Sequence, residues 1–143
     1  MGAVKIRPSD KAFSDCVRER AGWKCERCGS YFEPGRRMGL HCSHFHGRGK
    51  WSTRFDGDNC QALCYGCHMQ MGSHPDQHRR LMLEKLGPGG YDLLLERAND
   101  TRIGRRVKRE EAEIKKHYRA ELRRMQELRA NGEVGRIEFE GWS

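Results

Sequence analysis

Two Cys-x-x-Cys pairs constrain the fold of this chain more than any other feature of its sequence. The first pair is Cys25 and Cys28, the second is Cys64 and Cys67, and a long segment separates them. A structural zinc ion takes four thiolate or imidazole ligands in a tetrahedron, and two such pairs supply four thiolates. A thioredoxin-type redox centre would need one pair rather than two. The spacing therefore predicts one structural Zn²⁺ site with a substructure inserted between its halves.

The size of the chain favours one modest domain plus an extension. It has 143 residues, of which 36% are hydrophobic and 34% are charged, so a bound metal would help to stabilise a small core. Its seven cysteines are an odd number, and residues 1–10 carry no secretory signal pattern. We therefore expect reduced thiols inside a cell. No apolar run is long enough for a membrane span.

Periodicity and turn residues predict an α+β core. Apolar residues recur at helical spacing after Pro8, and Gly22 is expected to end that helix. The first cysteine pair comes next, and residues 38–45 read as a short strand. A glycine-rich, basic loop is expected over residues 46–54, and a helix that contains the second cysteine pair over residues 60–71.

The flank after this core is predicted to be helical. Residues 75–86 and 91–98 form two helical stretches that Gly87 and its neighbours interrupt. Residues 106–131 then read as one long amphipathic helix, whose apolar stripe must be buried on the core or against a second copy. We accordingly divide the chain into residues 1–74, a helical extension over 75–131, and a tail over 132–143.

The net charge favours a polyanionic partner such as DNA. The formal charge is +8 and the isoelectric point is near 9.3, and each Lys or Arg that contacts a phosphate releases condensed counterions. Arg48, Lys50 and Arg54 lie in the basic loop, where they could contact phosphates or form a merely solvated surface. Trp51 in the same loop could stack on an unpaired base or pack within the protein.

Three polar residues between and after the cysteine pairs point to phosphodiester hydrolysis. His44 fits a general base, His68 a ligand of a divalent cation, and the amide of Asn59 could bridge backbone groups across the loop. His46 is expected to share a strand face with His44, because alternate strand residues face the same side. His41 is expected on the same short strand, and His74, His78 and His117 are expected at helix surfaces or turns.

These residues resemble the HNH endonuclease family, which has a treble-clef, ββα-metal core. The resemblance rests on the two cysteine pairs, on Ser43-His44-Phe45-His46, on Asp58-Asn59 and on His68 directly after the last cysteine. The Thr-Arg-Phe-Asp stretch at 53–56 and the helical flank look most like phage NinG (Rap) recombination nucleases. That closer likeness covers residues 7–128.

The resemblance implies a catalytic mechanism and two kinds of metal. In related phage enzymes the strand histidine is the base, a second histidine lies two residues on, and a metal ligand comes directly after the last cysteine, which here are His44, His46 and His68. The implied catalytic cofactor is Mg²⁺ or Mn²⁺, and the products end in 5′-phosphate and 3′-hydroxyl. Many HNH enzymes have an acidic or histidine ligand where this chain has Ser43. His41, with the same strand parity, or Asp56 could replace it.

The same resemblance implies a phage protein in the cytoplasm of an infected bacterium. We expect a DNA endonuclease that acts in recombination, with selectivity for branched DNA such as Holliday junctions. One alternative is a nicking HNH nuclease for genome packaging or DNA degradation, and another is a non-catalytic zinc-dependent DNA-binding module. A homodimer would suit the two-fold symmetry of a junction, and a recombination or packaging protein would be a natural partner.

Overall fold

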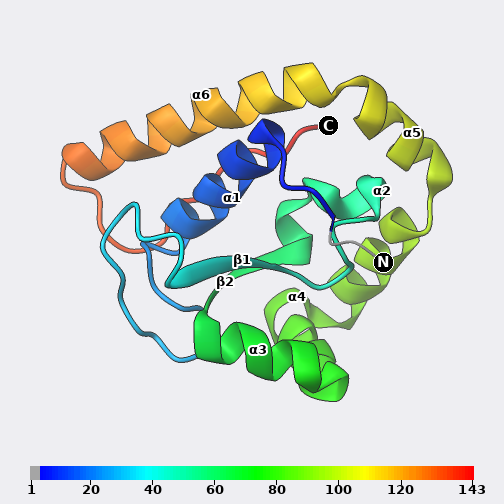
Figure 1. Cartoon of the computed structure of the whole chain (residues 1–143), viewed down its shortest axis with the longest axis horizontal. Coiled ribbons are helices and arrows are strands. Elements are labelled where there is room, and N and C mark those ends of the chain that lie inside the picture. The colour runs from blue at the N-terminus through cyan, green and yellow to red at the C-terminus, as the bar shows by residue number, and fades with distance from the viewer. Residues whose placement is uncertain (1–3) are drawn as a thin grey trace.

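A small sheet lies at the centre of the molecule and helices surround it (Figure 1). The structure is a computed structural model that describes residues 4–143. The α+β class is confirmed, and no helix within these residues is both long and apolar enough to cross a membrane. The elements in chain order are α1 (Pro8–Arg20), β1 (Leu40–His44), α2 (Trp51–Arg54), η1 (Gly57–Asn59), β2 (Cys60–Cys64), α3 (Tyr65–Ser73), α4 (Pro75–Ala98), α5 (Thr101–Arg109) and α6 (Glu111–Ala130).

Helix α1 forms as its sequence predicts. Proline stands in its first turn, where a missing N–H costs nothing, and the Asp10 carboxylate accepts a hydrogen bond of 2.8 Å from the Arg7 backbone. Phe13, Cys16 and Val17 are fully buried on its inner face. Gly22 has a φ of +65° just after the helix, a conformation that glycine adopts readily.

Strands β1 and β2 pair antiparallel, with Ser43 opposite Gln61 and His44 opposite Cys60. The expected strand at 38–45 is confirmed over Leu40–His44. The helix expected over residues 60–71 is wrong at its start, because Cys60–Cys64 is a strand and α3 begins only at Tyr65. Cys60, Gln61, Ala62 and Leu63 are all buried, and a strand covered on both faces shows no alternation that could separate it from a helix.

Helix α1 is fixed to both strands by arginines. The buried Arg18 donates from Nε to the Leu40 carbonyl at 2.7 Å, and Arg20 donates from Nη2 to the Cys60 carbonyl at 2.9 Å. These carbonyls lie at the beginnings of β1 and β2 and would otherwise be costly to bury. The sheet is therefore held against α1 by hydrogen bonds as well as by apolar packing.

The helical flank matches expectation at Gly87 and differs from it at the long helix. The predicted interruption at Gly87 is confirmed by its φ of +72° within α4. The long helix, however, begins earlier than residue 106 and is divided at Glu110 into α5 and α6. The loop expected over 46–54 also ends in the short helix α2. Packing explains both differences, because α5 lies against α2 while α6 lies along α1.

The apolar stripe of α6 is buried within the same chain. Ile114, Tyr118 and Met125 are fully buried, and they join the core that contains Phe13. A second copy of the chain is therefore not needed to cover the stripe. The residues after α6 return toward α1 (Figure 1), where the Ile137 backbone N–H donates to the Arg20 carbonyl at 3.2 Å. All three parts of the predicted division thus contribute to one core.

Candidate metal and catalytic site

The four cysteines of the two pairs come together as the spacing predicts. The Sγ atoms of Cys25, Cys28, Cys64 and Cys67 all lie within 4.8 Å of one another. A zinc ion bound tetrahedrally with Zn–S bonds of about 2.3 Å would place its sulfurs about 3.8 Å apart. The distance between Cys28 Sγ and Cys64 Sγ is 3.7 Å. The cluster could therefore hold a structural metal such as zinc.

Each cysteine pair forms a turn that directs backbone N–H groups at sulfur. The Cys28 N–H lies 3.5 Å from Cys25 Sγ, and the Cys67 N–H lies 3.4 Å from Cys64 Sγ. Such donors stabilise thiolates. Hydrogen bonds from the side chain and backbone of Ser30 lower the pKa of Cys28 to about 6, whereas burial raises the pKa of Cys67 to about 12.

A second group of possible ligands lies on the α1 side of the sheet. It consists of Cys42, His44 and Cys60, whose ligand atoms also lie within 4.8 Å of one another. A hydrogen bond with Cys60, and to a lesser degree the charge of His44, lower the pKa of Cys42 despite its burial. This group has three donors rather than four, so it lacks the closed ligand set of a structural zinc site.

A cavity of about 440 Å³ opens between the end of β1 and helices α3 and α4. Ser43, His44 and His68 line it, so the structure brings three predicted site residues together. His68 comes directly after Cys67 in the first turns of α3, and the cysteine cluster therefore sets its place. His78 of α4 also lines the cavity.

The ring of His44 is oriented by a backbone carbonyl. Its Nε2 lies 3.0 Å from the Arg54 carbonyl oxygen. Because a carbonyl oxygen can only accept, Nε2 carries the proton, and the neutral ring has an unprotonated Nδ1. That nitrogen is the one that can accept a proton during a reaction. The geometry is that of a histidine held in one tautomer.

The carbonyl that orients His44 belongs to a buried ion pair. Arg54 is 2% exposed, and its guanidinium donates to both carboxylate oxygens of Asp10, at 2.9 and 2.6 Å. The prediction that Arg54 contacts DNA is therefore wrong, because its charge is enclosed and paired. Burial alone would raise the pKa of Asp10, but the hydrogen bonds from Arg54 and the Arg7 backbone outweigh it and lower that pKa.

Asn59 bridges the loop as expected. It is fully buried, and its Nδ2 donates to the carbonyls of His46 and Thr53 at 2.9 and 3.1 Å. Its Oδ1 accepts from the His46 backbone N–H at 2.8 Å. One amide thus closes the chain between β1 and β2. Asn59 acts on the shape of the loop rather than on a substrate.

His46 does not share a face with His44. Strand β1 ends at His44, and His46 lies in the bend after it, so strand alternation no longer applies. His46 is not among the residues that line the cavity. Burial and the nearby Lys50 lower its pKa. Its backbone, rather than its ring, takes part in the site through Asn59.

Of the two residues considered as substitutes for the ligand absent at Ser43, only His41 lies beside His68. The rings of His41 and His68 are stacked, with centroids 5.0 Å apart and planes inclined by 5°. Asp56 instead binds Arg97 at 2.7 Å and caps η1, so it is not available. Ser43 itself is buried and lines the cavity.

The other loop residues differ in their availability to DNA. Arg48 is half-buried, with its Nε 3.8 Å from Asp10. Burial lowers the pKa of His68, and the positive charge of nearby Arg48 lowers it further to a smaller degree. Lys50 is exposed. The Trp51 ring lies 4.4 Å from the Arg54 guanidinium carbon and 5.5 Å from Lys108 Nζ. Packing against α5 thus accounts for Trp51 without a bound base.

Two histidines of the cavity have ring nitrogens of the kind that can bind metals. His68 Nδ1 and His78 Nε2 are buried ring nitrogens with no hydrogen-bond partner, and burial lowers the pKa of both histidines, which favours the neutral form that binds metals. Apart from the two cysteine-containing groups, residues 4–143 hold no three His, Cys, Asp or Glu ligand atoms within 4.8 Å of one another. The cavity is therefore rich in nitrogen donors but has no tight three-residue cage.

His78 was missed as a site residue because it was expected at a helix surface. It is only 8% exposed. The sequence did indicate that His78 is buried, since the apolar residues Leu81 and Met82 lie three and four residues later and share its side of the helix. Met82 is fully buried.

Comparisons of the chain with protein-family models, with curated proteins and with solved structures each found no match. The HNH resemblance therefore stays an interpretation of the motifs, and the function has to be inferred from the residues of the site.

Replacing one ligand of the cysteine cluster should remove the metal. We expect one zinc per wild-type chain, and none in Cys64→Ser, which should also unfold at lower temperature because metal binding and folding are coupled. Elemental analysis and thermal unfolding measure both. Cys60→Ser, which alters a buried cysteine of the other group, should keep one zinc. Two zinc ions in the wild type and one in Cys60→Ser would instead assign a metal to Cys42, His44 and Cys60.

Breaking the Asp10–Arg54 pair should destabilise the protein and disturb His44. At pH 7, Asp10→Asn should lower the free energy of unfolding by about 3–5 kcal/mol, because Arg54 becomes an uncompensated buried charge. Since the pKa of Asp10 is lowered in the folded state, its contribution is present above the unfolded value and lost as pH falls. Urea unfolding should therefore show the difference from wild type shrinking below about pH 4. The exposed Asp92→Asn should change stability by less than about 0.5 kcal/mol.

Proposed function

We propose that this protein is a metal-dependent DNA endonuclease of the HNH class with a treble-clef core. The observation that carries the proposal is the pairing of His44 Nε2 with the Arg54 carbonyl, in a cavity that His68 also lines. A histidine with one nitrogen fixed as donor and the other free to accept is the arrangement a general base needs. The Asn59 bridge and the order β1, β2, α3 support the same class.

In the proposed reaction, His44 Nδ1 accepts a proton from a water molecule as the water oxygen attacks phosphorus. The bond from phosphorus to the 3′ oxygen breaks, and that oxygen takes a proton from a solvent water to leave as a hydroxyl. A divalent cation held by His68, either Mg²⁺ or Mn²⁺ on the family resemblance, would stabilise the negative charge that develops on the phosphate and the leaving oxygen. Asn59 keeps the loop closed so that the Arg54 carbonyl and His44 stay aligned.

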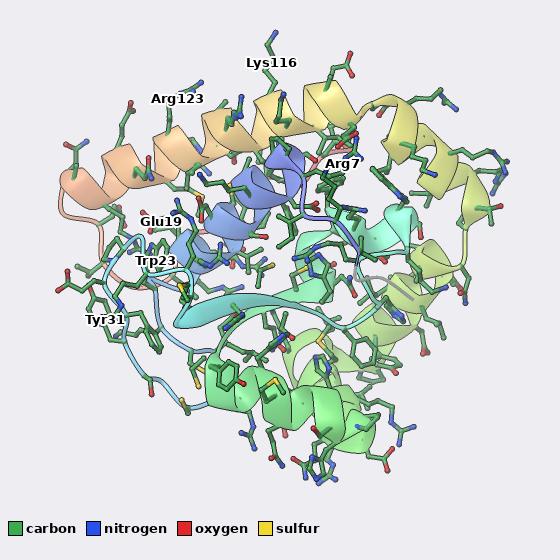
Figure 2. All side chains as sticks on the ribbon, viewed as in Figure 1. Arg7, Glu19, Trp23, Tyr31, Lys116 and Arg123 are labelled. Carbon is green, nitrogen blue, oxygen red and sulfur yellow. The ribbon has the colours of Figure 1, made fainter. Side chains whose placement is uncertain are left out.

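The charge distribution supports DNA as the substrate. Arg48 and Lys50 lie in the loop after His44, and the chain carries a net charge of +8. On α6, Lys116 and Arg123 project away from α1 (Figure 2). Basic side chains of this kind attract a phosphate backbone without reading its sequence. Phage recombination remains the proposed setting, with branched DNA as the proposed substrate.

A second candidate function is zinc-dependent DNA binding without catalysis. The observation that favours it is the buried hydroxyl of Ser43 at the position where an acidic metal ligand is common in HNH enzymes. A hydroxyl is a weak ligand for a hard cation. On this alternative, the basic surface would bind DNA while the cavity stays inactive.

The base assignment is tested by His44→Ala. Cleavage of duplex DNA with Mg²⁺ or Mn²⁺ should fall at least about a hundredfold, since general-base catalysis contributes on that order. Zinc content and melting temperature should stay near the wild-type values. His74→Ala, which alters an exposed histidine, serves as the control. Full activity in His44→Ala would refute the assignment. Absence of cleavage by the wild type would favour the binding module, and cleavage that persists with a chelator would contradict the metal dependence.

Selectivity for branched DNA is tested by comparing substrates of matched sequence. We expect faster cleavage of a synthetic four-way junction than of linear, nicked or single-stranded DNA. Initial rates at equal substrate concentration, with a chelator as the blank, measure the preference. Equal rates on junction and duplex would contradict selectivity and favour the nicking nuclease for packaging or degradation.

A further inference from the structure

His78 is a buried histidine outside the segment that carries the HNH motif. It belongs to α4, yet it lines the same cavity as Ser43, His44 and His68. The chain turns at His74, where the helical geometry of α3 ends, and α4 then returns beside α3. This turn allows two histidines ten positions apart to contribute to one cavity.

We propose that His78 is a ligand of the divalent cation in this cavity, together with His68, and that it takes the place of the acidic ligand absent at Ser43. The inference rests on the proposed nuclease function, because that function is what requires a cation there. It assigns to α4 a direct part in the site.

Two unpartnered ring nitrogens support this assignment. His78 Nε2 and His68 Nδ1 are both buried, and neither has a hydrogen-bond partner. A buried polar atom without a partner costs on the order of 1–3 kcal/mol. A cation shared by the two imidazoles would satisfy both atoms at once. The Ser43 hydroxyl, from the strand side of the same cavity, could add a weak oxygen donor.

The ring of His78 is held by aromatic neighbours rather than by polar ones. Phe45 meets it edge to face, with ring centroids 4.9 Å apart and planes inclined by 86°. Tyr91 lies on the same phenylalanine, with centroids 5.7 Å apart. These contacts fix the ring without using its nitrogens. A metal ligand that is positioned by packing keeps its lone pair free.

The donor set also predicts which cation binds. Mg²⁺ prefers oxygen ligands, whereas imidazole nitrogens suit transition metals. A site with two histidines and no carboxylate should therefore bind Mn²⁺ more tightly than Mg²⁺. Asp76 also lines the cavity, but its side chain is 90% exposed, and its Oδ1 lies 3.9 Å from Arg79 Nη2. His41 Nε2 is also buried and without a partner, but His41 does not line the cavity. We assign the ligand to His78 because its nitrogen is buried and unpaired and the residue lines the cavity with His68.

The test measures Mn²⁺ binding to the full-length, zinc-loaded protein without DNA. Electron paramagnetic resonance of free Mn²⁺ during a titration gives the stoichiometry and the dissociation constant. We expect one Mn²⁺ per chain beyond the zinc, displaced poorly by Mg²⁺. His78→Gln should weaken binding at least about tenfold, and Ser43→Asp should tighten it. His74→Gln, from the turn between α3 and α4, and Asp76→Asn should leave the constant unchanged.

A measurement on the unsubstituted protein covers the case in which His78→Gln does not fold. In a two-dimensional NMR spectrum, Mn²⁺ should broaden the ring resonances of His68 and His78 before those of His74 and His117. Broadening that spares His78 would overturn the inference. So would an unchanged constant in a folded His78→Gln, a loss confined to Asp76→Asn, or the absence of a second metal in the wild type.

The same data separate this inference from the proposed function. Mn²⁺ binding that depends on His78, in a protein that cleaves no DNA, would support the metal site and refute the nuclease. DNA cleavage that requires His44 but is indifferent to His78 would support the nuclease and refute the added ligand.

Discussion

The cluster of four thiols is the constraint on which the rest of the site depends. It joins the turn after α1 to the end of β2 and the first turn of α3. Glu26, inside the first cysteine pair, extends the join, because its N–H donates to the Ala62 carbonyl and its carboxylate accepts from the Ala62 N–H. In a chain with a modest apolar fraction, a bound ion could supply cross-links that a small core cannot. His68 directly follows Cys67, so the cysteine cluster determines where His68 lies.

The other half of the site is positioned by charge rather than by metal. Asp10 of α1 holds Arg54, and the Arg54 carbonyl holds His44. A buried ion pair is rarely the most stable way to fill a core, but it fixes direction as well as distance. Here the ion pair fixes Arg54, and the Arg54 carbonyl oxygen in turn orients the imidazole of His44. The two histidines of the proposed reaction are thus placed by two independent devices.

The sequence predicted those structural features that depend on the spacing of residues or on the chemistry of neighbouring residues. The cysteine spacing predicted the cluster, Pro8 and Gly22 bounded α1, Gly87 marked the interruption in α4, and the Asn59 amide bridged the loop. It was uninformative where tertiary contacts decide. A strand buried on both faces looked like part of a helix, the division at Glu110 results from packing on two different partners, and Arg54 and His78 looked like surface residues. Solvent exposure of a single charged or polar side chain depends on distant segments, so no local pattern encodes it.

The hydroxyl of Tyr118 connects the chain next to His44 with helix α6 and with the tail. It donates to the Phe55 carbonyl, next to the carbonyl that orients His44, and it accepts from the Trp142 backbone N–H. A segment excised at the boundaries of the cysteine motif would carry every residue of the HNH pattern and still lose this support. The motif on a new scaffold would therefore need another donor for the Phe55 carbonyl.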